Sequence, residues 1–503
     1  MAYRRKEENY LVGPPLEGIQ LDMPPTMIND AASTHCMNLS MIGQALTQRA
    51  GVVPLGDNLP LDGPIFGFRQ FADLDGNVHT MACTDGTIYS LNSITNEWEV
   101  LDDTYTTVGE WGQYINTAVF TGQLVMASIN IPLLLWDGGV TVSEIDAQDS
   151  VRGSFVKNFG NRLVVFDTLE DSVHRTRQRV RWTAIGTYDD FDNGDFVDLV
   201  DSPGGIVAVE NLGNELVIYK ENSIVIMTYL GSPTTFGFET RVAHLGGVAP
   251  RGVVALNDRH YFLGADNVYL YQGGRTITPV GDGLRDEMPA LIQGNAVERV
   301  VSGMFGDEVW FVAPMESIEP DTVYVYNWRK GVWFKYNINA SVLDRYVTSE
   351  SVTIGDLEGS IGDLAGLIRD FGGTATTPFL VVGKSDGYIG LINSSIATDH
   401  GEHFTLEWQS KDFVLSELYQ ARYIRYRGID FELSGTEVEV SYSNDEGITW
   451  TPLKTLELSS RYKWYQTYFD SVDYKIRFRL RSTDGEVFSL RAFNLKFLEV
   501  SER

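Results

Sequence analysis

Residues 443–450 read S-N-D-E-G-I-T-W and carry the clearest chemical signature in the chain. They fit the Asp-box pattern S-x-D-x-G-x-T-W. In such a run Asp445 can accept hydrogen bonds from turn amides, Gly447 permits a tight backbone, and Trp450 packs beneath the hairpin. These roles are local, so the motif predicts a structural turn.

A catalytic interpretation of the same motif needs more residues. Asp boxes occur in sialidases, where they lie away from the catalytic centre. A sialidase also requires three arginines, a tyrosine with a carboxylate partner, and an acid. The box occurs once here, and nothing in the sequence places such side chains together. We therefore expect a turn without glycosidase activity.

Two of the seven histidines, His400 and His403, are close in sequence and are flanked by Asp399 and Glu402. Imidazole and carboxylate groups are common metal ligands, so the run D-H-G-E-H could hold a metal ion. An exposed polar linker explains the run equally well. We assign no metal site on this pattern.

Residues 173–181, V-H-R-T-R-Q-R-V-R, are the one basic cluster of the chain. The cluster could contact nucleic acid or an acidic partner. We favour the alternative, a solvated loop that leads into a strand at residues 180–184.

Motifs of the common enzyme classes are missing from the sequence. No phosphate-binding loop, nucleophile elbow or zinc-binding helix motif appears, and no dinucleotide-binding glycine run has strand–helix context. We predict no catalytic residues, no cofactor and no metal site, so the chain is not expected to be an enzyme.

Composition limits the possible functions further. With 503 residues, two or three domains are expected, and the formal net charge is 39 − 68 = −29. Gripping nucleic-acid phosphates depends on lysine and arginine, so this charge argues against such binding, although it permits a channel through which DNA slides. Solubility alone explains the acidity equally well.

Compartment signals are few. The two cysteines, Cys36 and Cys83, are too few for a disulfide framework. The N-terminus has no apolar run typical of a signal peptide, and no stretch approaches the ~18 apolar residues of a membrane span. We expect a soluble protein without membrane insertion.

The elements that must position any site are hairpins that recur along residues 65–336. Six units each have an apolar strand, a tight turn and a second apolar strand. Their turns centre on Gly76, Gly122, Gly160, Gly213, Asp258 and Gly306, at intervals of 38 to 53 residues. A second hairpin follows in several units, for example at residues 84–101 and 265–280. Two hairpins per unit predict four-stranded blades of a β-propeller.

The fold class we predict is therefore all-β: a propeller of six blades, with seven as the alternative, over residues 51–392. Residues 1–50 form an extended N-terminal arm with a short helix within 28–48, and an insertion lies around 341–375 with a short helix at 362–370. The run 377–392 either completes a blade or adds a seventh. Six alternating runs within residues 393–503 predict an antiparallel C-terminal β-sandwich.

Aromatic residues cluster in one strand of this C-terminal region: Trp464, Tyr465, Tyr468 and Phe469. If exposed, they could bind a glycan or a protein. We favour the alternative that they lie in the core of the sandwich.

Three stretches carry a resemblance to a family. They are GIQLDMPPTMINDAASTHCMNLSMIGQALTQRAGVVPL, which ends in Arg49-x-Gly51; NFGNRLVVF with VRWTAIGTYDDFDNG, which contains Arg162 and Trp182; and LVIYKENSIVIMTYLG continuing through RVAHLGGVAPRGVVALNDRHYFLGADNVYLYQGG. Over residues 16 to about 335 the chain resembles the tail hub and nozzle proteins of short-tailed bacteriophages, also called packaged-DNA stabilisation proteins. The C-terminal sandwich is not covered.

The resemblance implies a structural virion protein, made in the bacterial cytoplasm and built into the phage tail. Its copies would form a ring, expected to be a hexamer, below the portal and the head-to-tail adaptor, with tail fibre or needle and plug proteins as neighbours. The ring would retain packaged double-stranded DNA and conduct it during ejection without sequence-specific binding. The family has no catalytic residues to transfer. The alternative is another virion propeller that docks tail fibres or binds a receptor glycan.

Overall fold

The structure is a computed structural model of the chain. It describes residues 8–105, 114–146, 150–171, 173–284, 287, 294–315, 317–347, 378–415, 423–482 and 485–499. The helix expected at 362–370 and most of the insertion expected at 341–375 lie outside these ranges.

The chain divides into two compact units. Unit 1 comprises Met1–Val53, Arg259–Asn339 and Asn393–Arg503, and unit 2 comprises Pro54–Asp258 and Ala340–Ile392. Strands dominate both units, and among the described residues only short 3-10 turns are helical. In that part of the chain no helix has the length and apolar character to cross a membrane.

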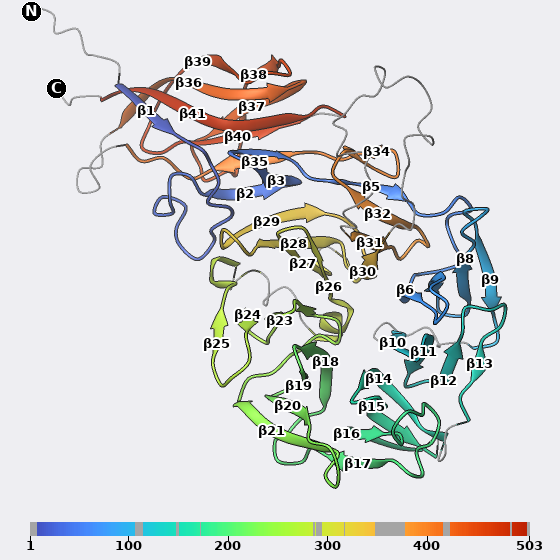
Figure 1. Cartoon of the computed structure of the whole chain (residues 1–503). Coiled ribbons are helices and arrows are strands. Elements are labelled where there is room, and N and C mark those ends of the chain that lie inside the picture. Colours follow the sequence, from blue (N-terminus) through green and yellow to red (C-terminus); the bar gives the residue numbers. More distant parts are fainter. Residues whose placement is uncertain are drawn as a thin grey trace, which may run out of the picture. The chain divides into compact units, whose positions relative to one another are not determined.

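Unit 2 is built from successive antiparallel meanders (Figure 1). Four of them have four strands each: β6 (Gly67–Ala72), β7 (Val78–Cys83), β8 (Ile88–Leu91), β9 (Trp98–Asp102); β10 (Asn116–Phe120), β11 (Gln123–Ser128), β12 (Ile131–Trp136), β13 (Ser143–Glu144); β14 (Arg152–Phe159), β15 (Arg162–Glu170), β16 (His174–Trp182), β17 (Asp195–Asp198); β18 (Ile206–Leu212), β19 (Glu215–Lys220), β20 (Ser223–Tyr229), β21 (Phe236–Ala243). The short strand β22 (Val253–Ala255) follows, and β30 (Val342–Tyr346), β31 (Phe379–Gly383) and β32 (Ile389–Asn393) form a further meander.

The meanders of unit 2 pack on their neighbours through apolar faces. Trp182 of one sheet meets Phe236 of the next edge to face, with 5.0 Å between ring centroids. The inner strands β19 and β20 are almost wholly buried along their length. A continuous apolar run such as LVIY suits a strand covered on both faces, which explains why these strands do not alternate.

Unit 1 contributes two more meanders: β23 (His260–Leu263), β24 (Val268–Tyr271), β25 (Ile277–Pro279); and β26 (Val301–Phe305), β27 (Glu308–Ala313), β28 (Thr322–Asn327), β29 (Val332–Asn337). The described residues thus contain seven meanders in succession from Gly67 to Asn393. The chain is an all-β protein with a β-propeller and additional β-sheet. The seventh meander, β30–β32, includes the run at 377–392.

The predicted turns are confirmed at the glycines of the hairpin units. Gly122 and Gly213, for example, have φ of +76° and +59°, in the left-handed region that glycine tolerates.

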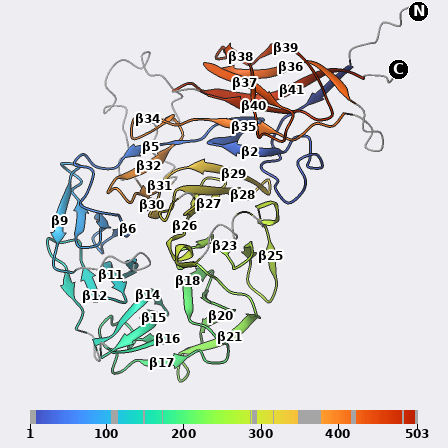
Figure 2. The ribbon, with the colours of Figure 1, turned by 180° about the vertical axis from the view of Figure 1, so that it is seen from behind.

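The additional sheet regions lie in unit 1, where N-terminal and C-terminal strands share two sheets (Figures 1 and 2). One sheet has the order β3 (Leu39–Ile42), β4 (Ala45–Gln48), β41 (Phe488–Glu499), β36 (Ile424–Gly435), β39 (Lys463–Asp473), and β1 (Glu8–Val12) also pairs with β41. The other extends β29 through β2 (Ser33–Met37), β35 (Glu407–Ser410), β40 (Arg477–Arg481), β37 (Glu437–Ser443) and β38 (Thr451–Glu457). The short strands β5 (Gly51–Pro54), β33 (Thr398–Asp399) and β34 (Glu402–His403) complete the unit.

Aromatic side chains fill the space between these two sheets. Trp408 of β35 lies 5.4 Å from Phe493 of β41, and Phe431 of β36 meets Phe478 of β40 edge to face at 6.5 Å. These rings are buried, so the two sheets pack face to face as a sandwich.

Two local predictions are wrong. The short helix expected within residues 28–48 is replaced by β2, β3 and β4, because these residues pair with C-terminal strands that a local pattern does not reveal. Residues 342–346, assigned to the insertion, form β30.

Candidate functional site

The Asp-box turn joins β37 to β38 and is closed by side-chain hydrogen bonds. Asp445 Oδ1 accepts from the Thr449 amide at 2.9 Å and from Ser443 Oγ at 2.7 Å, and Asp445 Oδ2 accepts from Thr449 Oγ1 at 2.6 Å. These bonds, chiefly the one from the Thr449 hydroxyl, lower the pKa of Asp445 to about 2. Gly447 has φ of +89°, which the tight turn requires. The predicted structural turn is confirmed.

Trp450 follows the turn, and the guanidinium of Arg479 lies 4.5 Å from the centre of its ring. Lys475 forms an ion pair with Glu446 of the same turn. The turn is therefore stabilised by contacts with Arg479 and Lys475 as well as by its own hydrogen bonds.

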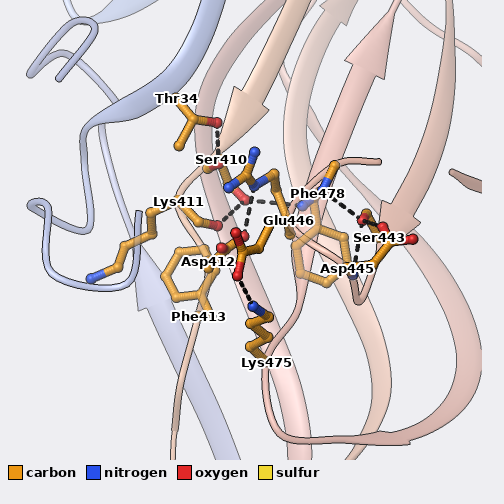
Figure 3. Close-up of polar contacts among 12 residues, drawn as sticks. Thr34, Ser410, Lys411, Asp412, Phe413, Ser443, Asp445, Glu446, Lys475 and Phe478 are labelled. Atoms are coloured by element: carbon orange, nitrogen blue, oxygen red, sulfur yellow. Dashed lines mark hydrogen bonds and ion pairs between the residues drawn. The ribbon is translucent and has the colours of Figure 1, made fainter. Parts of the chain in front are cut away.

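A buried ion pair lies close to this turn, since a Cβ built at Gly447 would meet Arg477 Nη1 at 3.0 Å. Figure 3 draws the partner of this arginine, Asp412, together with residues of the turn. Arg477 Nε donates to Asp412 Oδ1 at 2.6 Å, and the two side chains are 7% and 2% exposed. The Phe413 amide donates to the Ile476 carbonyl at 2.8 Å, which fixes the segment of Asp412 beside β40. The Phe478 amide donates to Ser410 Oγ, so β35 and β40 are also joined by a side chain.

The carboxylates of this group are held by hydrogen-bond donors or cations. Asp445 is bound by the turn, Glu446 by Lys475, and Asp412 by Arg477. These contacts fix the positions of the strands, so we assign this group of residues a structural role.

The D-H-G-E-H run forms the tight hairpin of β33 and β34, with His400 in the left-handed region at φ +51°. Asp399 is taken by an arginine: Arg49 Nη1 donates to its Oδ1 at 3.0 Å and Arg49 Nη2 to its Oδ2 at 2.5 Å. Across the described ranges, no group of three or more histidine, cysteine, aspartate or glutamate side chains could hold a metal ion.

Arg49 is a residue whose role the sequence did not predict. It is 1% exposed, its Nε donates to Asn38 Oδ1 at 2.9 Å, and its guanidinium lies 3.7 Å from the centre of the Phe404 ring. Two residues on, a side chain at Gly51 would meet the Thr398 carbonyl at 2.3 Å. The Arg-x-Gly sequence could have indicated this role, because Arg49 binds Asp399 and Gly51 permits the close approach of the backbone at Thr398.

The basic cluster lies on strand β16, so the prediction of a loop there is wrong. Its four arginines face carboxylates of unit 2. The pairs are Arg175 with Asp167 at 2.6 Å, Arg177 with Glu221 at 3.0 Å, Arg179 with Asp198 at 2.7 Å, and Arg181 with Glu170 at 3.2 Å. The hydrogen bond to Asp198 is the largest cause of a raised pKa at Arg179.

The four aromatic residues of β39 divide between its two faces. Phe469 is stacked on Tyr442 at 5.1 Å, and the Tyr465 hydroxyl accepts from the Ser459 amide, so these two point inward. Trp464 and Tyr468 are 48% and 68% exposed. The prediction that all four lie in the core is therefore wrong for Trp464 and Tyr468.

Comparisons with known proteins add little to this geometry. No family model and no curated protein matches the sequence. Among solved structures, the WD40 domain of Neurospora crassa Pan2 is similar at 9% identity and a TM-score of 0.39, over 71% of this chain and 97% of that one. An exo-β-1,3-galactanase from Phanerochaete chrysosporium matches at 8% and 0.27, over 89% and 100%, and a gluconolactonase from Xanthomonas campestris at 10% and 0.31, over 60% and 97%. The fold assignment rests on the sheets described above.

Proposed function

We propose that the chain is a structural protein of the tail hub or nozzle of a short-tailed bacteriophage. Its copies form a ring, a hexamer, below the portal and the head-to-tail adaptor, with fibre or needle and plug proteins as further neighbours. The ring retains packaged double-stranded DNA and conducts it during ejection. The protein acts by assembly rather than by catalysis.

The observation that supports this proposal is the neutralised basic strand β16. Each of its four arginines lies within 3.2 Å of a carboxylate, in a chain of net charge −29. Affinity for DNA requires cations that release counterions from phosphate, and an acidic wall repels phosphate instead. Paired arginines and a negative net charge both reduce the affinity for DNA, as is required of a channel through which DNA slides.

The residues that carry the family resemblance have structural roles that agree with this proposal. Trp182 packs in the core between two sheets of unit 2, and Arg162 Nη1 donates to the Thr183 carbonyl at 2.6 Å. Both residues therefore stabilise the sheets of unit 2.

One experiment tests retention directly. Phage particles assembled without this protein are expected to package DNA and then lose it, measured as nuclease-sensitive DNA per particle, with recovery when the intact protein is supplied. Full retention of DNA by particles that lack the protein would contradict the proposal.

A second experiment tests the supporting observation. The variant Glu170→Gln/Asp198→Asn removes the carboxylates that face Arg179 and is expected to gain weak, salt-sensitive binding to double-stranded DNA. The intact protein should show none. An exposed pair elsewhere in the chain, Arg329 with Asp307, provides the control Asp307→Asn.

A second candidate function is that of another virion propeller, which docks tail fibres or binds a receptor glycan. The exposure of Trp464 and Tyr468 favours it. Particles that retain DNA without the protein but no longer adsorb to cells would support this candidate.

A further inference from the structure

The outer face of the sheet β1–β41–β36–β39 presents an ordered row of side chains. Every second residue of β39 points outward, and the burial of the strand alternates accordingly. Along this row exposed apolar and polar residues take turns: Trp464, Gln466, Tyr468, Asp470 and Val472. An exposed sheet face of a soluble domain is normally polar, so two aromatic rings and a valine at regular intervals indicate a contact surface.

The ring of Tyr468 is held in position by its neighbours. Gly428, opposite it on β36, has no side chain, and a Cβ built there would meet Tyr468 Cδ1 at 3.4 Å. Lys496 Nζ of β41 lies 5.1 Å from the ring centre, and the Tyr468 hydroxyl donates to Gln466 Oε1 at 2.9 Å. A ring that is already positioned loses little conformational entropy when a ligand stacks on it.

The two rings are four residues apart on one strand, which corresponds to about 13 Å. Gln466 lies between them on β39. Asp430 lies opposite Gln466 on β36, where Lys496 binds its carboxylate, and Asn494 lies opposite Asp430 on β41, so the residues at this level of the sheet are polar. Flat apolar platforms separated by hydrogen-bonding groups match an extended oligosaccharide, whose pyranose rings have apolar faces and hydroxyl-bearing edges.

The exposed charge of this face is cationic. The side chains of Arg425, Arg427 and Arg491 are 45%, 42% and 42% exposed. Of the carboxylates that pair with them and with Lys496, Asp470 is 46% exposed, but Glu432 and Asp430 are only 22% and 11% exposed. Arg425 and Arg427 also share the single carboxylate of Asp470. Although the chain as a whole has a net charge of −29, the exposed cations of this face favour an anionic ligand.

We propose that this face is a binding surface for an extended acidic oligosaccharide. Trp464 and Tyr468 stack on two of its sugar rings, and Arg427 pairs with a carboxylate substituent. The proposal deepens the second candidate function, the binding of a receptor glycan. It does not depend on the hub function, because a hub protein can carry such a surface on its sandwich.

The test is the binding of the full-length protein to oligomers of about six to eight sugars, measured by calorimetry. The acidic probes are polygalacturonate, alginate, hyaluronan and polysialic acid, and the neutral probes are cello- and laminari-oligosaccharides. We expect binding of at least one acidic probe, weakened about tenfold or more in Trp464→Ala/Tyr468→Ala. Arg427→Ala should weaken acidic probes and leave neutral ones unchanged.

Ile448→Ala, which removes an 82% exposed apolar side chain from the Asp-box turn, is the matched control and should bind as the intact protein does. Thermal unfolding of every variant checks that the sandwich is folded. Binding of none of the acidic probes, or equal binding by the double variant, would overturn the proposal. Self-association of the intact protein that the double variant loses would also overturn it, since a second copy would then occupy the face.

Discussion

Replacement of Arg49 by alanine should destabilise unit 1 strongly. The arginine side chain is buried and donates to both carboxylate oxygens of Asp399, to Asn38 Oδ1 and to the carbonyls of Ala50 and Asn337. Alanine removes all of these donors at once and leaves a cavity beside the Phe404 ring.

The expected loss follows from the geometry of the pair. Removing one partner of a buried ion pair costs about 3–5 kcal/mol, because the remaining charge loses its compensation. Asp399 is 19% exposed, so water solvates part of it after the substitution, and a value near the lower end, about 3 kcal/mol, is expected. For a unit of this size, that corresponds to a decrease in Tm of roughly 6–12 °C.

Thermal and urea unfolding, monitored by tryptophan fluorescence and circular dichroism, measure the effect. Arg49→Lys should recover only part of the loss, since an ammonium group cannot bind the carboxylate with two parallel hydrogen bonds. Arg329→Ala removes a partner from an exposed pair and should cost under about 1 kcal/mol. A Tm for Arg49→Ala equal to that of Arg329→Ala would refute the role assigned to Arg49.

Three further predictions concern unit 1. Arg477→Ala should lower the free energy of unfolding by about 3–5 kcal/mol, because it leaves the Asp412 carboxylate buried without its cation. In urea unfolding, Arg477→Met/Asp412→Asn should recover most of that loss, and equal losses for both variants would contradict this. Burial raises the pKa of Glu308 despite hydrogen bonds from neutral donors, so the folded state binds this proton more tightly than the unfolded state does. The free energy of unfolding should therefore fall as pH rises above about 4.5, and Glu308→Gln should remove this part of the pH dependence. Parallel pH profiles for the variant and the intact protein would contradict the assignment. Deletion of residues 1–48 removes β1–β4 and should lower the Tm of unit 1, while limited proteolysis should still leave the segments of unit 2 protected. An unchanged Tm would show that these strands add no stability.

The propeller could be predicted from sequence because its signals are local. A hairpin turn such as the one at Gly213 depends on residues that are consecutive in the sequence, and the apolar runs on both sides predict buried strands. The Asp-box turn was predictable for the same reason: Ser443, Asp445 and Thr449 bond one another within seven residues.

Contacts between distant parts of the chain could not be predicted. Glu8 pairs with Phe497, and Arg49 binds a carboxylate 350 residues further on, so no local pattern reveals either contact. The exposure of Trp464 and Tyr468 is an intermediate case. Alternation along the strand separates them from Tyr465 and Phe469, but only the structure shows which face of the sheet is covered.

The most direct test of the proposed hub function is the copy number of this protein in purified phage particles, measured by quantitative mass spectrometry against the portal subunit. We expect about one copy for every two portal subunits, which corresponds to a six-fold ring on a twelve-fold portal. Absence of the protein from the particles would contradict the hub function.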